Sequence, residues 1–522
     1  MPRRVPFLVG AILAAFAASA SAAIGDAPIK TETGLVAGTP GRNAGVVVFR
    51  GIPYAAPPVG DRRWRPPEPA SKWDGVRAGD HYSPICIQNE AGWYAPNNGT
   101  KPAADLSEDC LYLNVFTAAG TTEGRPVIVF VHGGGLTFGA GSHYDGEGLV
   151  RKGAVVVTLN YRLGVFGFLA HPELTTESSH HASGNYGLLD QIAALQWVQR
   201  NIAAFGGDPR RVTLAGQSAG AWSVNYLMAS PLAHGLFQRI IGESGGQFAP
   251  TRTHAAAEDA GIQFAKAAGA DALAALRRMP AADLLKVRRV PGVAGRVWDA
   301  NVDGWFLPDT VAAIFEQGKQ NDVPILIGST AGEETSPRLP AVTADALREE
   351  ATKNFGPDAS TFSKLYPFSS DDTARTAQQD LHRDETFGWP TREWARAQAK
   401  TGKSKVFFYF FNYVAPGPYA DAGLPAPHGA ELAFAYDWVT SRTDTNTAWR
   451  AEDRELAATM SAYWMNFAAT GDPNGKGLVR WPAYSPQTDS VLLVGNQLQP
   501  GALPHKDTLD FLTPYLRKAN LQ

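Results

Sequence analysis

The chain reads RVTLAGQSAGAWSVNYLMA at residues 211–229, and this stretch decides the fold. Residues 212–215 have the apolar character of a buried strand, and the residues after Ser218 continue as a helix. A Gly-x-Ser-x-Gly sequence between a strand and a helix is typical of a nucleophile elbow, a sharp turn that projects the serine above a sheet. The two glycines leave room for that turn. The stretch therefore predicts a strand–turn–helix unit with Ser218 as a reactive serine.

Apolar runs alternate with helical patterns on both sides of this unit. Residues 188–202 repeat apolar side chains at spacings of three and four, which marks one face of an amphipathic helix. Such alternation predicts an α/β fold with right-handed crossovers and a mostly parallel sheet covered on both faces. The Pro- and Gly-rich part before residue 120 is expected to form an antiparallel edge. The other expected strands cover residues 126–131, 154–159, 239–243, 324–328 and 405–414.

Length and composition indicate a chain with one large core. The 522 residues are 44% hydrophobic, and we expect a single catalytic domain over residues 24–522. Residues 251–320 and 335–400 are helical, Ala-rich and charged, and are expected to be insertions that roof a site. The formal net charge is -3, with no basic stripe. This distribution argues against a nucleic-acid partner.

The N-terminus resembles a secretory signal. Arg3 and Arg4 precede an apolar run at residues 5–17 that is too short to span a bilayer, and small residues follow at 20–23. We expect residues 1–23 to be a signal peptide, which predicts a secreted or periplasmic protein without stable membrane insertion after cleavage. An uncleaved membrane anchor is the alternative. A monomer is the default expectation.

The chain has two cysteines, Cys86 and Cys110. In an exported protein an even pair suggests one disulfide, and two free thiols are the alternative. Asn98 begins a glycosylation sequon in the same loop, which matters only in a eukaryotic host.

A reactive serine needs partners, and the sequence offers them. The run HGGG at residues 132–135 follows an expected strand, where glycines let backbone amides turn toward one point. The N–H groups of Gly134 and Gly135, with that of Ala219 just after the nucleophile, are candidate donors to an oxyanion. A plain flexible loop is the alternative for this run.

An acid and a histidine are expected to follow the serine in that order. Glu333 and Glu334 lie on a loop just beyond the strand expected at 324–328, where catalytic groups collect in open α/β sheets. His428 comes later, between a proline and a glycine that suit a fixed loop position. A histidine base needs an acid that fixes its tautomer, so either glutamate can complete the set with Ser218.

Several longer blocks resemble the type-B carboxylesterases of the carboxylesterase/cholinesterase family. The resemblance covers roughly residues 28–515. The serine signature is matched from Phe205, and the second signature from Glu108, although that match fades after Phe116. The matching blocks are residues 51–58, 108–115, 160–162, 184–191, 205–220 and 466–473.

The resemblance implies an α/β-hydrolase fold and a serine esterase that acts on small-molecule esters without a metal or organic cofactor. Residue by residue it makes Ser218 the nucleophile, His428 the base and Glu333 the acid. The family acid stands five residues after the glycine that ends its strand, which selects Glu333; Glu334 replaces the usual following glycine and stays an alternative. The resemblance also implies a disulfide between the two cysteines.

Three further residues are candidates for supporting roles. Glu431, three residues after His428, is expected to be structural or to hydrogen-bond near the site. Ser244 follows another strand and could support the acid. Trp222, one helical turn after Ser218, could line the pocket or pack in the core.

The substrate is less determined than the chemistry. Cholinesterases of this family bind the choline cation on a tryptophan ten residues before the second loop cysteine. In this chain Thr100 stands at that spacing, and Trp93 and Tyr94 lie in the same loop but out of register. The resemblance therefore disfavours choline binding. A general carboxylesterase is the leading hypothesis. The alternatives are a lipase-like, feruloyl, lactone, polyester or toxin-ester hydrolase, or a non-catalytic adhesion relative.

Overall fold

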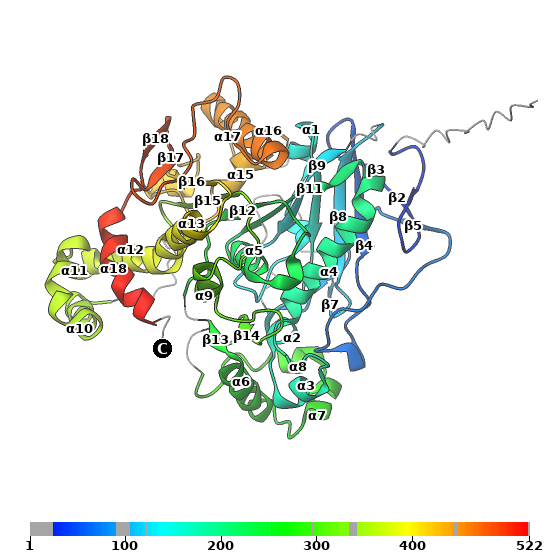
Figure 1. Ribbon diagram of the computed structural model, residues 1–522, viewed down its shortest axis with the longest axis horizontal. Coiled ribbons are helices and arrows are strands. Elements are labelled where there is room, and N and C mark those ends of the chain that lie inside the picture. Colours follow the sequence, from blue (N-terminus) through cyan, green and yellow to red (C-terminus); the bar gives the residue numbers. More distant parts are fainter. Residues whose placement is uncertain are drawn as a thin grey trace, which may run out of the picture.

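The computed structural model describes residues 24–89, 105–120, 124–249, 251–293, 296–333, 342–441 and 447–519. An 11-stranded sheet runs through the molecule in the order β18-β17-β16-β15-β12-β11-β9-β10-β8-β4-β3. Helices lie on both faces of this sheet (Figure 1). The expected signal peptide, Asn98, Trp93, Tyr94, Thr100 and Glu334 lie outside the described residues.

The centre of the sheet is parallel and its edges are antiparallel. From β10 through β17 every neighbouring pair runs parallel, whereas β8, β4, β3 and β18 add antiparallel strands. This confirms the expected α/β class and its antiparallel edge. The strands of the sheet are β3 (Thr39–Pro40), β4 (Val46–Pro53), β8 (Tyr112–Ala118), β9 (Arg125–Val131), β10 (Val155–Leu159), β11 (Gly207–Gln217), β12 (Arg239–Glu243), β15 (Ile325–Thr330), β16 (Val406–Phe411), β17 (Ser490–Val494) and β18 (Leu498–Ala502).

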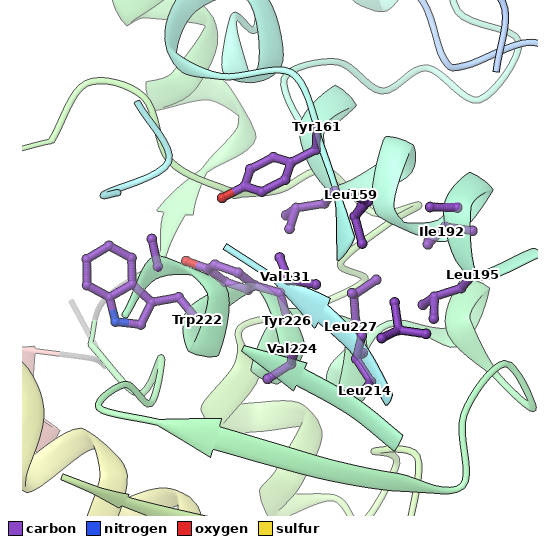
Figure 2. Packing of buried hydrophobic residues seen from close by; sticks show 14 of the residues in the cluster. Val131, Leu159, Tyr161, Ile192, Leu195, Leu214, Trp222, Val224, Tyr226 and Leu227 are labelled. Carbon is purple, nitrogen blue, oxygen red and sulfur yellow. The ribbon is translucent and has the colours of Figure 1, made fainter. Parts of the chain in front are cut away.

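Each face of the sheet has its own apolar core, which explains why the central strands are apolar throughout. Along β9, Val129 and Val131 belong to one core, and Ile128 and Phe130 to the other. Figure 2 shows α4 and α5 covering the first face, where their side chains meet those of β9, β10 and β11. Helix α17 covers the opposite face. The helices of these layers are α1 (Glu147–Arg151), α2 (Gly164–Phe168), α3 (Pro172–Glu177), α4 (Tyr186–Asn201), α5 (Ala219–Ala229), α13 (Trp389–Thr401), α15 (Leu432–Ala435), α16 (Trp438–Ser441) and α17 (Ala451–Thr470). Helix α14 (Pro418–Asp421) has no buried residue.

The two expected insertions contain helices. The outer helices α10 (Ala344–Phe355), α11 (Ala359–Leu365), α12 (Asp371–Arg383) and α18 (Lys506–Ala519) share a separate apolar cluster and lie together at one end of the molecule (Figure 1). The remaining elements are α6 (His254–Ala267), α7 (Leu273–Arg278), α8 (Ala281–Leu284), α9 (Val311–Glu316) and the short strands β1 (Ile29–Lys30), β2 (Leu35–Ala37), β5 (Val76–Ala78), β6 (Ile85–Cys86), β7 (Leu106–Ser107), β13 (Arg252–Thr253) and β14 (Asn301–Val302). Among the described residues, no helix has the length and apolar character needed to cross a membrane.

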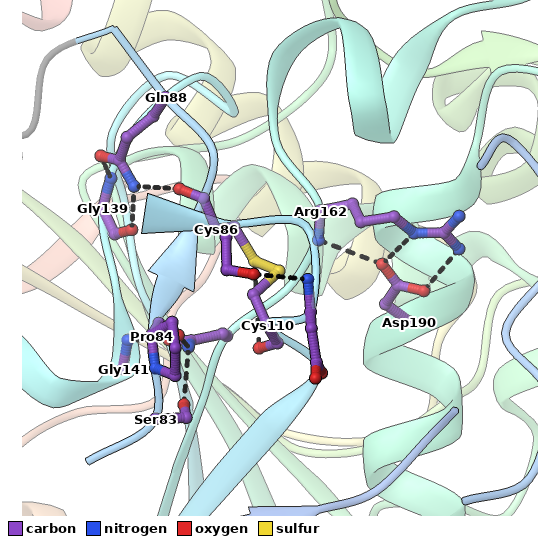
Figure 3. Close-up of a disulfide and its surroundings, with 12 residues drawn as sticks. Ser83, Pro84, Cys86, Gln88, Cys110, Gly139, Gly141, Arg162 and Asp190 are labelled. Atoms are coloured by element: carbon purple, nitrogen blue, oxygen red, sulfur yellow. Dashed lines mark hydrogen bonds and ion pairs between the residues drawn. A yellow bond between two sulfur atoms is a disulfide. The ribbon is translucent and has the colours of Figure 1, made fainter. Parts of the chain in front are cut away.

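The two cysteines are joined as expected. Cys86 and Cys110 form a disulfide with a Cα–Cα distance of 5.0 Å (Figure 3). Next to it, the Gln88 side chain exchanges two hydrogen bonds with the backbone of Gly139. The disulfide-linked segment is thereby attached to the loop that follows β9.

Candidate active site

Ser218 stands in the strained turn that the elbow sequence predicts. Its backbone has φ 58° and ψ −126°, and it forms the N-cap of α5 directly after β11. The Ser218 N–H donates to the Glu243 carbonyl at 2.8 Å, which anchors the turn to β12. A side chain at Gly220 would overlap the carbonyl oxygen of Val131, so only glycine lets α5 approach β9 this closely.

The glycine run after β9 lies against the nucleophile. A Cβ on Gly133 would come within 2.9 Å of the Ser218 Cβ, and Gly134 and Gly135 have φ of +109° and +60°. Within the described chain, the N–H groups of these two φ-positive glycines donate to no protein acceptor. Ala219 begins α5, so its N–H also lacks an intrahelical acceptor. Among the described residues, the N–H groups of all three expected donors are thus left without a backbone acceptor.

The base of this loop is fixed by His132, whose role the sequence did not reveal. Its ring stacks on Tyr161 with centroids 4.4 Å apart, and the Tyr161 hydroxyl donates to the His132 carbonyl at 2.9 Å. Burial lowers the pKa of His132 to about 3. His132 is therefore neutral near pH 7 and acts as a packed aromatic side chain.

Glu333 and His428 meet although 95 positions separate them. The Nδ1 atom of His428 contacts the Glu333 Oε2 atom, and Glu333 Oε1 accepts the Thr330 N–H at 2.7 Å. The Gly332 N–H donates to the Ala426 carbonyl at 2.8 Å, which joins the two loops. The Glu333 side chain is fully buried, whereas that of His428 is 25% exposed.

The second ring nitrogen of His428 faces the elbow. The Gln217 amide nitrogen lies 2.9 Å from His428 Nε2. Because a carboxylate oxygen only accepts, the ring proton resides on Nδ1, toward Glu333, and Nε2 is left as an acceptor that faces the Gln217 amide. This is the tautomer that a general base needs. Nothing in the residue pattern pointed to Gln217, which precedes the serine and would otherwise be a spacer.

Two more glutamates lie buried beneath the histidine. The hydroxyls of Ser244 and Tyr409 donate to Glu431 Oε1 at 3.4 Å and 3.2 Å. Burial and the nearby Glu333 raise the pKa of Glu431 to about 7. Burial and the charge of Glu431 raise the pKa of Glu243 well above its usual value. Glu431 therefore lies near Glu333, and the Ser244 hydroxyl bonds Glu431 rather than Glu333 itself. The expected support of the acid by Ser244 stays a prediction.

The Glu243 carboxyl group is hydrogen-bonded by the residue that follows α15 and by a residue of α17. Glu243 accepts hydrogen bonds from the Tyr436 hydroxyl at 3.2 Å and from the Trp464 indole N–H at 2.9 Å. These contacts hold the Glu243 side chain below the elbow while its carbonyl binds Ser218.

Of two aromatic side chains, Trp222 packs in the apolar core and Phe387 contacts His428. Trp222 is only 6% exposed and belongs to the apolar core, yet the Arg296 guanidinium lies 3.9 Å over its ring. Trp222 is thus a core residue with one face toward a charged group. On the histidine side, the Phe387 ring lies 4.8 Å from the His428 ring. Within the described ranges, no group of three or more His, Cys, Asp or Glu side chains could hold a metal ion.

The chain matches known esterases over nearly its whole length. The family model described as "Carboxylesterase family" matches residues 25–511. Fumonisin B1 esterase of Sphingopyxis macrogoltabida is 38% identical over 90% of this chain and 87% of its own. Para-nitrobenzyl esterase of Bacillus subtilis (strain 168) is 35% identical over 90% and 95%, and human cocaine esterase is 34% identical over 91% and 88%.

Solved structures agree with the sequence matches. A PNB esterase superimposes with a TM-score of 0.78 at 34% identity, covering 94% of this chain and 99% of that chain. A thermophilic PNB esterase gives 0.81 at 33% identity, with coverage of 93% and 99%. The expected α/β-hydrolase fold and the resemblance are both confirmed. The chain belongs to the carboxylesterase family and is a hydrolase that acts on carboxylic esters.

Proposed function

We propose that this esterase works through an acyl-enzyme on Ser218, with His428 as the base and Glu333 as the acid that orients it. The observation that carries the proposal is the Glu333–His428 contact, which leaves Nε2 unprotonated beside the elbow. A serine hydroxyl is a weak nucleophile until such a base takes its proton.

The reaction then follows in two steps. Ser218 attacks the ester carbonyl as His428 takes its proton, and the N–H groups of Gly134, Gly135 and Ala219 stabilise the oxyanion. His428 returns the proton to the leaving alcohol. Water, activated by the same histidine, then releases the acid and frees the serine.

Three finer statements belong to the same proposal. Residues 1–23 are a cleaved signal peptide and the mature protein is secreted or periplasmic, which the disulfide between Cys86 and Cys110 supports. Residues 24–522 form one catalytic domain whose insertions, around 251–320 and 335–400, roof the site. The protein is a monomer by default.

The leading substrate proposal is a broad range of small esters. A relative named fumonisin B1 esterase favours a toxin ester as the second candidate. A panel of p-nitrophenyl esters of increasing acyl length, with fumonisin B1 alongside, separates the two. Broad activity across the panel supports the first, and activity confined to fumonisin B1 supports the second.

Substitution of the proposed triad tests the mechanism. Ser218→Ala and His428→Ala are expected to lower kcat by about 10⁴-fold or more, because the residues act as a unit. Glu333→Gln is expected to be severely impaired, while Glu334→Gln, its matched neighbour, stays active. Ester hydrolysis and labelling by a fluorophosphonate probe are measured, with Ser363→Ala as the surface control. Near-normal turnover in folded Ser218→Ala would sink the proposal.

A further inference from the structure

A π-turn interrupts the long helix next to the catalytic histidine. Helix α12 ends at Arg383, Asp384–Gly388 form a π-helix, and α13 begins at Trp389. The Trp389 N–H donates to the Asp384 carbonyl, five residues back. Pro390 explains the interruption, because its ring has no N–H and would collide with the carbonyl four residues earlier in an α-helix. Such π-turns occur often at functional sites.

The π-turn places Phe387 on the histidine. The Phe387 side chain is buried, and its ring centroid lies 4.8 Å from that of His428 at an interplanar angle of 44°. The hydrogen-bonding atoms of the imidazole point only within its plane, toward Glu333 and toward the elbow. Those two contacts fix the ring's direction but not its tilt, which a packed aromatic neighbour can fix.

The turn is itself firmly held. The Asp384 carboxylate accepts hydrogen bonds from Arg383 Nε at 2.8 Å, the Tyr366 hydroxyl at 2.9 Å and the Thr508 hydroxyl at 2.7 Å. These partners come from α12, from the residue that follows α11 and from α18. The outer helices thus fix the first residue of the π-turn, and with it the position of Phe387 three residues later.

We propose that Phe387 is a positioning residue for ester hydrolysis: held by the π-turn, its ring fixes the tilt of the His428 imidazole and excludes water from one face. This inference rests on the proposed function, which makes His428 the base. It goes beyond it by giving the insertion at 335–400 a defined contact with the catalytic machinery.

The charges around His428 determine the sign of the expected pH effect. Glu333 contacts the His428 ring directly, and the buried Glu431 interacts with it electrostatically. On the π-turn itself, Asp384 is paired, while burial and the charges of Glu350 and Asp384 raise the pKa of Glu385 to about 7. Removing the phenyl ring admits water, which favours the charged imidazolium. The pKa of the base should therefore rise.

The test compares Phe387→Ala and Phe387→Leu with the parent enzyme, using p-nitrophenyl acetate. We expect kcat of Phe387→Ala to fall about tenfold with little change in KM, because the base is misplaced rather than the substrate. The acidic limb of kcat/KM should move up by about half a pH unit. Phe387→Leu should restore most of the parental kcat and most of the parental position of the acidic limb. It remains informative where the alanine variant does not fold.

Two controls separate positioning from general damage. Phe49→Leu alters a buried phenylalanine of β4 that packs on Phe205, away from the π-turn. Glu385→Gln removes the other group that titrates near the same pH. Both control substitutions should leave the acidic limb of the kcat/KM profile at the parental pH. An unmoved limb with kcat within about twofold of the parent in Phe387→Ala, or an equal shift in Phe49→Leu, overturns the proposal. An active His428→Ala enzyme would instead refute the proposed function.

Discussion

The nucleophile side of the site, residues 131–135 and 216–222, differs from the histidine side in what fixes its geometry. On the nucleophile side, close contacts of the backbone fix the geometry. Gly133 lies against Ser218, and Gly220 lies so close to the Val131 carbonyl that any side chain would overlap it. No rotation of a side chain can relieve such a contact.

On the histidine side, defined by Glu333, Phe387, His428 and Glu431, side chains hold other side chains. Their contacts come from the ends of two strands, a π-turn and the turn before α15. Each contact can weaken gradually, and the carboxylates respond to pH. The comparison therefore predicts that substitutions on the nucleophile side cause large losses of activity and stability, whereas substitutions on the histidine side change them by smaller steps.

The largest effect is expected from Gly220→Ala. The new methyl group would overlap the Val131 carbonyl oxygen, so α5 or β9 must move apart. Overpacking of this kind costs about 3 kcal/mol, and a displacement of about 1 Å at a reacting group can cost about 10² in rate. Urea unfolding and ester hydrolysis measure the two losses.

Gly495→Ala is the control for that substitution. A Cβ there meets only the Gln497 carbonyl, at 4.0 Å, so neither stability nor activity should change appreciably. If Gly220→Ala behaved like this control, the idea that backbone contacts fix the nucleophile side would be wrong.

An intermediate effect is expected from Glu431→Gln, and it depends on pH. In the folded protein the pKa of Glu431 is raised to about 7, against 4.5 normally. Between those values the unfolded chain has lost a proton that the folded protein keeps, so stability falls as pH rises through this window. The total loss is on the order of 3 kcal/mol. Glutamine has no proton to lose, so the variant should escape it.

The measurement is the free energy of unfolding of both proteins from about pH 4 to about pH 8. The difference between them should grow in favour of the glutamine variant as pH rises. Glu243 remains in both proteins, and its raised pKa makes the stability of both fall as pH rises. Parallel curves would show that Glu431 is not held protonated, and Glu452→Gln, an exposed glutamate, should give such parallel curves.

The same comparison explains what the sequence could reveal. The nucleophile side is encoded by short glycine patterns, so GQSAG and HGGG were readable as a turn and a donor loop. The alternation of apolar runs gave the sheet, because each central strand is covered on both faces. Glu333 and His428 followed in the expected order, although choosing between Glu333 and Glu334 needed the resemblance.

The side-chain contacts of the histidine side could not be read in this way. The interaction of Glu243 with Glu431 depends on how distant segments pack. The position of Glu431 after His428 suggested a role near the site, but nothing local pointed to Glu243. The Gln217 contact with His428 is equally long-range. Phe387 did have a signal: Pro390 stands inside a helical pattern, which predicts a break or kink. Only the folded chain shows that this break points a ring at the histidine.

The smallest effect is expected from Gln88→Ala, which asks whether the nucleophile side also needs side-chain support. Gln88 donates to the Gly139 carbonyl at 3.0 Å and accepts from the Gly139 N–H at 2.9 Å (Figure 3). The alanine leaves both buried backbone groups unpaired, which costs about 1–3 kcal/mol. Because Gly139 closes the loop that begins at Gly133, kcat should also fall about threefold to tenfold.

Gln199→Ala is the matched control, since its amide also binds two backbone carbonyls, those of Pro209 and Leu236, but far from the glycine loop. Its stability should fall while kcat stays unchanged. If the two glutamine variants had equal, normal kcat, the glycine backbone alone would suffice to hold the oxyanion loop. A loss of kcat confined to Gln88→Ala would instead mean that the nucleophile side depends on one side-chain contact, that of Gln88 next to the disulfide.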